Sequence, residues 1–141
     1  MGSGWLDFAS HFFLPRSPMT FNELHLDPAL LAALPAELHT PTRIQQLAIP
    51  AALKGQDLLA LAQTGSGKTA AFGLALLARL NPRRFAVQAL VLCPTRELAD
   101  QVTTEIRRLA RAEENIKVVT LCGGVPLRGQ MLSLEHGAHI V

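Results

Sequence analysis

The sequence Ala-Gln-Thr-Gly-Ser-Gly-Lys-Thr at residues 62–69 decides the fold, because it stands between an apolar run, 58–62, and a helix-forming run, 70–80. A short apolar run bounded by such signals predicts a buried strand. Gly65 and Gly67 let the backbone curl so that several N–H groups point at one spot, and the start of a helix adds positive potential there. The stretch therefore predicts a phosphate-binding loop for a nucleoside triphosphate.

Lys68 and Thr69 supply the chemistry expected of such a loop. The Lys68 ammonium would reach the β- and γ-phosphates and the Thr69 hydroxyl would bind Mg²⁺, so these are the predicted catalytic residues. The usual first glycine is replaced by Ala62, and the alternative interpretation is a Gly/Ser-rich turn followed by a lysine. The predicted nucleotide contacts of the loop are Gln63, Thr64, Gly65, Ser66, Gly67, Lys68, Thr69 and Ala70.

The composition sets broad limits on the class of protein. At 141 residues with 49% hydrophobic residues, the chain holds one domain at most and can bury a core. A net charge of +2 permits an anionic partner without requiring one. No apolar run approaches the ~18 residues of a membrane span, and Cys93 and Cys122 lack metal-type spacing. We expect a cytoplasmic protein that does not cross a membrane.

Beyond residue 19, strand and helix signals alternate. This pattern predicts an α/β fold in which a parallel sheet has helices on both faces and ligand sites at the carboxyl ends of the strands. The predicted helices are 27–34, 42–53, 67–80, 95–112 and 127–136, and the predicted strands are 58–62, 88–93, 117–121 and 139–141.

Residues 1–18 differ from the rest of the chain and are interpreted as a non-native or flexible extension. They begin Met-Gly-Ser-Gly, close at Pro15 and Pro18, and hold four of the seven aromatic residues of the chain. The alternative is a short amphipathic helix that docks a protein partner, because these aromatics fall at helical spacing. The four aromatics are Trp5, Phe8, Phe12 and Phe13.

Three further signatures accompany the loop. Thr-Pro-Thr-Arg-Ile-Gln at 40–45 resembles the Q motif of DEAD-box RNA helicases, Pro-Thr-Arg-Glu-Leu-Ala at 94–99 resembles their motif Ia, and 123–124 resembles their glycine doublet. The resemblance spans roughly 21–141, and within the family the sequence is most similar in appearance to the bacterial members. One departure is that Glu37 and Leu38 stand where the family usually has glycine and an aromatic residue.

The resemblance implies a RecA-like P-loop NTPase fold, truncated here, with 19–141 as the N-terminal part of the first domain. It implies ATP and Mg²⁺ as cofactors, RNA as partner, and ATP hydrolysis coupled to duplex unwinding. The family's Asp-Glu-Ala-Asp motif and second domain would lie beyond Val141, so we expect no turnover by the isolated chain. The alternatives are a standalone ATP- or RNA-binding module and another P-loop NTPase.

The resemblance also implies that Phe21, Arg43 and Gln45 contact the nucleotide. The Gln45 carboxamide offers an acceptor beside a donor, which matches adenine and disfavours guanine. The alternative for Gln45 is a capping box with Thr42, and the alternative for Phe21 is a place in the core.

The resemblance also implies that RNA binds through its backbone at a helix start and at paired glycines, which permit close approach. The alternatives are an ordinary capped helix and a flexible turn, and three nearby arginines on the same helix are interpreted as a solvated face. The residues assigned to RNA are Pro94, Thr95, Arg96, Gly123 and Gly124, and the three arginines are Arg107, Arg108 and Arg111.

Overall fold

The computed structural model describes residues 19–112 and 115–141, so the extension predicted at 1–18 and its docking alternative lie outside the described residues. Each of the five predicted helices is confirmed. The elements are η1 (Phe21–Leu24), α1 (Pro28–Ala32), α2 (Arg43–Leu53), α3 (Lys68–Leu77), α4 (Arg96–Leu109), η2 (Ala110–Ala112) and α5 (Leu127–Glu135). Within the described ranges, none of these helices has the length and apolar content needed to cross a membrane.

The helix starts follow the local sequence. The Asp27 side chain accepts a hydrogen bond from the N–H of Ala29 at 2.8 Å, and Pro28 occupies the first position of α1. Thr95 accepts from the N–H of Leu98 at 3.2 Å and caps α4 in the same way. Each cap satisfies one of the N–H groups that a helix start leaves unpaired.

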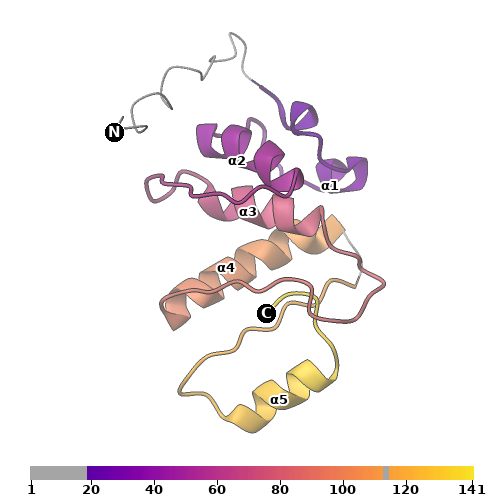
Figure 1. Cartoon of the computed structure of the whole chain (residues 1–141), viewed down its shortest axis with the longest axis vertical. Coiled ribbons are helices and arrows are strands. Elements are labelled where there is room, and N and C mark those ends of the chain that lie inside the picture. Colours follow the sequence, from indigo (N-terminus) through magenta and orange to yellow (C-terminus); the bar gives the residue numbers. More distant parts are fainter. Residues whose placement is uncertain (1–18, 113–114) are drawn as a thin grey trace, which may run out of the picture.

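Helices α1 to α4 form a stack that buries the apolar core. Helix α2 packs against α3, and α3 packs against α4 (Figure 1). Burial of each leucine or isoleucine side chain is favourable by about 1.5–3 kcal/mol, so the stack is held mainly by its apolar faces. The largest fully buried apolar side chains are Leu24, Leu30, Ile49, Leu74, Ile106, Leu109 and Ile140.

The predicted sheet is not shown. In the described residues, the predicted strands appear as extended segments with two isolated parallel bridges, which join Ile140 to Ala89 and to Val118. The segment 58–62 remains without strand pairing among the described residues, and Leu59 and Leu61 are 92% and 87% exposed. A strand exists only through hydrogen bonds to a neighbour, so an apolar run alone could not settle this point.

Helix α5 lies on the other side of the extended segments from α4 (Figure 1). It buries none of its own side chains and is attached through polar contacts. The Gln130 carboxamide accepts from the N–H of Cys122 at 2.8 Å and donates to its carbonyl oxygen at 3.0 Å. The Lys117 ammonium donates to the carbonyl of Ser133 at 2.9 Å.

His139 connects three distant parts of the chain. Its side chain is fully buried, its Nδ1 accepts from the N–H of Lys117 at 3.1 Å, and its Nε2 lies 3.0 Å from the carbonyl oxygen of Pro82. Its ring also contacts Phe85, with centroids 4.9 Å apart. The neutral ring with hydrogen on Nε2 satisfies both polar contacts.

We expect His139→Ala to lower the free energy of unfolding by about 2–5 kcal/mol, because it opens a cavity and removes both hydrogen-bond partners. Urea unfolding followed by circular dichroism measures the change. His136→Ala is the control, because His136 is exposed and its ring has a polar contact with the Leu132 carbonyl, one turn earlier in the chain. Equal effects of the two substitutions would contradict this role of His139.

Candidate functional site

The predicted phosphate-binding loop folds as a tight turn that leads directly into α3. Gly65 and Gly67 have φ of 79° and 87°, in the left-handed region that favours glycine. The N–H of Ser66 donates to the carbonyl of Gln63 at 3.3 Å, and Gly67 is the N-cap of α3. The first N–H groups of α3 therefore follow the turn without intrahelical partners, as a phosphate site requires.

Lys68 is folded back onto the loop. Its ammonium donates to the carbonyl oxygens of Ala62 and Gln63, both at 2.6 Å. The two carbonyls thus take up N–H donors of the Lys68 ammonium that phosphate oxygens would otherwise accept from. The Ser66 hydroxyl is buried and has no hydrogen-bond partner among the described residues. A movable cation and an unsatisfied buried hydroxyl both fit an anionic ligand at this turn.

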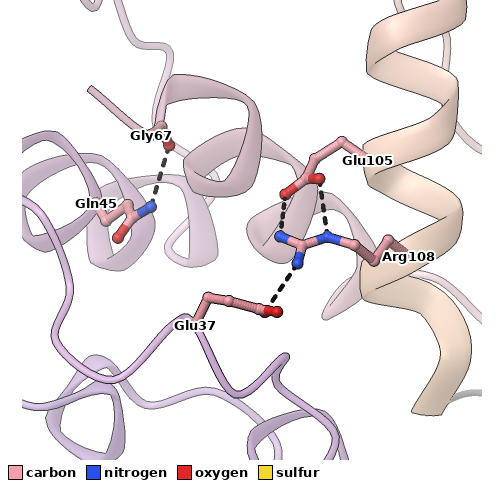
Figure 2. A network of polar contacts seen from close by, with 5 residues as sticks. All are labelled: Glu37, Gln45, Gly67, Glu105 and Arg108. Carbon is pink, nitrogen blue, oxygen red and sulfur yellow. Dashed lines mark hydrogen bonds and ion pairs between the residues drawn. The ribbon is translucent and has the colours of Figure 1, made fainter. Parts of the chain in front are cut away.

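Thr42 and Gln45 are docked against this loop. The Thr42 hydroxyl donates to the carbonyl of Ser66 at 2.8 Å, and the Gln45 Nε2 donates to the carbonyl of Gly67 at 3.2 Å (Figure 2). The Gln45 Oε1 accepts from the N–H of Thr42 at 2.9 Å, as in the capping-box alternative. The sequence did not reveal that this cap also binds the loop.

Phe21 and Arg43 lie in different surroundings. The Phe21 side chain is buried in the apolar core, at 4% exposure, which is the place that the core alternative described. Arg43 is exposed and is the first residue of α2. Contact of either side chain with a nucleotide stays a prediction.

The residues predicted to bind RNA form two exposed groups that lie close together. Pro94, Thr95 and Arg96 lead into α4, and a Cβ added at Gly124 would lie 3.5 Å from Nη1 of Arg96. A cavity of about 420 Å³ extends between the two groups and is lined by Pro94, Arg96 and Gly123 among others. The structure thus brings the exposed Arg96 guanidinium and the start of α4 close to the exposed glycine backbone at 123–124.

The interpretation of the α4 arginines as a solvated face is wrong for Arg108, whereas Arg107 is exposed as expected but also contacts a neighbouring segment. Arg107 donates to the carbonyl of Val118 at 2.8 Å. Arg108 is half-buried and forms ion pairs with Glu105 and Glu37. Their long side chains reach neighbouring segments that the sequence pattern could not identify. Arg111 is exposed, as expected.

The pKa values of Glu37 and Arg108 are shifted in opposite directions. A hydrogen bond from its own backbone N–H, together with the Arg108 charge, lowers the pKa of Glu37. The hydrogen bond to Glu105, and then the charges of both carboxylates, raise the pKa of Arg108. Both groups are therefore charged near neutral pH.

No cluster of three or more His, Cys, Asp or Glu side chains suited to a metal occurs in the described part of the chain. The binding of a divalent ion at the Thr69 hydroxyl stays a prediction. Mg²⁺ is commonly bound with few protein ligands and the substrate's own phosphates.

The loop with two left-handed glycines, a lysine and a threonine at the start of a helix defines the P-loop class. Residues 42–141 match the family described as DEAD/DEAH box helicase. The chain belongs to this family.

Two bacterial relatives illustrate the similarity. The chain is 58% identical to the ATP-dependent RNA helicase DbpA of Escherichia coli (strain K12), over 72% of this chain and 22% of that protein. It is 45% identical to the DEAD-box ATP-dependent RNA helicase CshA of Streptococcus pneumoniae, over 87% of this chain and 24% of that protein. The chain spans about a quarter of the length of these curated relatives.

Solved structures show the same similarity. A DEAD box protein from Methanococcus jannaschii superposes with a TM-score of 0.80 at 38% identity, over 87% of this chain and 34% of that chain. The RNA helicase Prp28 from Chaetomium thermophilum, bound to ADP, gives 0.75 at 39% identity, over 90% of this chain and 32% of that chain. The chain is thus a fragment of a DEAD-box RecA-like domain.

Gly67→Ala should destabilise the loop more than Gly65→Ala. Both residues have positive φ, which costs a non-glycine residue about 1–2 kcal/mol. Only at Gly67 would the added Cβ meet Gln45, 2.5 Å from its Nε2, whereas at Gly65 nothing lies within 4 Å. Urea unfolding of the two variants measures the difference, and equal losses of stability would contradict the contact with Gln45.

Proposed function

We propose that this chain is the nucleotide-binding portion of an ATP-dependent RNA helicase, with residues 19–141 as the N-terminal part of its first RecA-like domain. The observation that carries the proposal is the docking of Thr42 and Gln45 on the phosphate loop. A segment that would contact the base is thereby joined to the turn that would hold the phosphates. The names of DbpA and CshA, both ATP-dependent RNA helicases, support it.

The loop binds the phosphates of ATP in this proposal. Lys68 releases the carbonyls of Ala62 and Gln63 and reaches the β- and γ-phosphates, while the Ser66 hydroxyl and the first N–H groups of α3 donate to phosphate oxygens. The Thr69 hydroxyl holds Mg²⁺. When bound, Mg²⁺ neutralises developing charge on the phosphates during transfer. Lys68 and Thr69 remain the proposed catalytic residues of this chain.

Gln45 selects adenine in this proposal. Each of its polar atoms already makes one contact with the protein, at Thr42 and Gly67. A carboxamide has a second acceptor lone pair on oxygen and a second N–H on nitrogen. These remaining positions match the N6 amino group and N7 of adenine, and because Gln45 is 1% exposed, neighbouring atoms must move aside for the base to reach them. Phe21 and Arg43 are proposed as further nucleotide contacts.

RNA binds at the two exposed groups near the start of α4. Thr95 and Arg96 offer backbone N–H groups and a positive charge to phosphate, and the glycines at 123 and 124 permit close approach of the RNA backbone. Such contacts carry no base information, so binding is independent of sequence. Pro94 sets the entry of the chain into this helix.

The whole protein would couple ATP binding and hydrolysis to the separation of RNA strands. The family's Asp-Glu-Ala-Asp sequence does not occur in these 141 residues, so we propose that other parts of a longer protein supply the carboxylates that position the attacking water, together with a second RecA-like domain. The 141-residue chain alone is then expected to bind nucleotide without turning it over.

Competition titrations of ATP and GTP against a fluorescent ADP analogue test the proposal. The unmodified chain should prefer ATP. Gln45→Ala should weaken ATP binding and reduce the preference by about tenfold, because it removes the carboxamide that pairs with adenine and is left unpaired by guanine. Gln56→Ala is the matched control, since Gln56 is exposed beyond the end of α2. Equal affinities for ATP and GTP in the unmodified chain would contradict adenine recognition.

A further inference from the structure

Arg108 connects α4 to the segment that precedes the nucleotide contacts. Its Nε and Nη2 donate to the two carboxylate oxygens of Glu105, one turn earlier on the same helix, at 3.0 and 2.9 Å. Its remaining Nη1 donates to Oε2 of Glu37 at 3.1 Å (Figure 2). Glu105 thus fixes the plane of the guanidinium, and the free nitrogen is presented to a residue 71 positions away in the sequence.

Glu37 lies in the connection between α1 and α2, which has little structure of its own. A turn closes there through the N–H of Leu38 and the carbonyl of Pro35 at 2.8 Å. Five residues after Glu37 comes Thr42, whose hydroxyl reaches the carbonyl of Ser66. The position of this connection therefore controls where Thr42 and Gln45 meet the phosphate loop.

We propose that Arg108 and Glu37 are positioning residues for the nucleotide site, because their ion pair holds the segment 37–45 between α4 and the phosphate loop. The inference rests on the proposed nucleotide binding. It deepens that function by adding a contact from the helix whose first turn is the proposed RNA site.

The expected effect is modest and depends on salt. Glu37 is largely exposed, with 75% of its side chain accessible, while Arg108 is 34% accessible. Exposed ion pairs contribute little and are screened by salt. Because Glu105 already orders the guanidinium, pairing with Glu37 requires little additional ordering of Arg108. Loss of the pair should weaken nucleotide binding by roughly two- to fivefold at low salt.

The experiment titrates N-methylanthraniloyl-ADP into the full 141-residue chain at about 50 mM and about 500 mM salt. The variants are Glu37→Gln, Arg108→Met and the two combined, where methionine keeps an apolar stem in place of the arginine. Glu135→Gln is the matched control, because this exposed residue of α5 forms no ion pair with any residue that the structure describes. Hydrogen exchange at the amides of Leu38 and Thr42 is measured in parallel.

At low salt, each single variant should lose affinity, and the double variant should bind about as well as the weaker single variant, because either change alone already removes the contact between Arg108 and Glu37. At high salt, the differences should disappear. The amides of Leu38 and Thr42 should exchange faster in the variants, and the control should match the unmodified chain throughout.

Unchanged affinity, additive losses in the double variant, or the same loss in Glu135→Gln would overturn the inference. If the unmodified chain bound no nucleotide, the proposed function would fail for this chain. The exchange measurement then still decides whether the ion pair holds the segment: unchanged rates at Leu38 and Thr42 overturn it, and faster rates support it.

Discussion

The buried carboxamide of Gln45 is the contact on which the arrangement of the site depends. At 1% exposure it binds the N–H of Thr42 and the carbonyl of Gly67, so it joins the start of α2 to the start of α3. A buried polar group without a partner costs about 1–3 kcal/mol, which makes both bonds hard to give up. The close approach also explains the glycine at 67, because a Cβ there would collide with the carboxamide.

The helix stack extends this contact to the rest of the structure. Helix α2 packs on α3 and α3 packs on α4, so one apolar core supports the start of α2, the turn at 65–67 and the start of α4. Side chains in a close-packed core cannot shift independently. The polar contacts of Thr42, Gln45 and Arg108 add to this packing in the connections between the helices.

The sequence predicted the local features of the chain well. Helix positions and the turn at 65–67 follow from patterns within a few residues. Contacts between distant segments were not predictable in the same way. The bond from Gln45 to Gly67 spans 22 positions and the pair of Arg108 with Glu37 spans 71, and neither leaves a periodic signal. Strand pairing is also non-local. The apolar run 58–62 predicts a strand, but local sequence cannot show whether the run has a pairing partner, and it is unpaired in the described residues.

The central claim is that the segment around Gln45 and the phosphate loop act as one nucleotide site. Hydrogen–deuterium exchange of the 141-residue chain with and without Mg·ATP tests it most directly, since it locates the ligand on the backbone. The account predicts slower exchange at both 42–46 and 63–70 when Mg·ATP is present. Protection of the phosphate loop alone, or protection outside both segments, would contradict it.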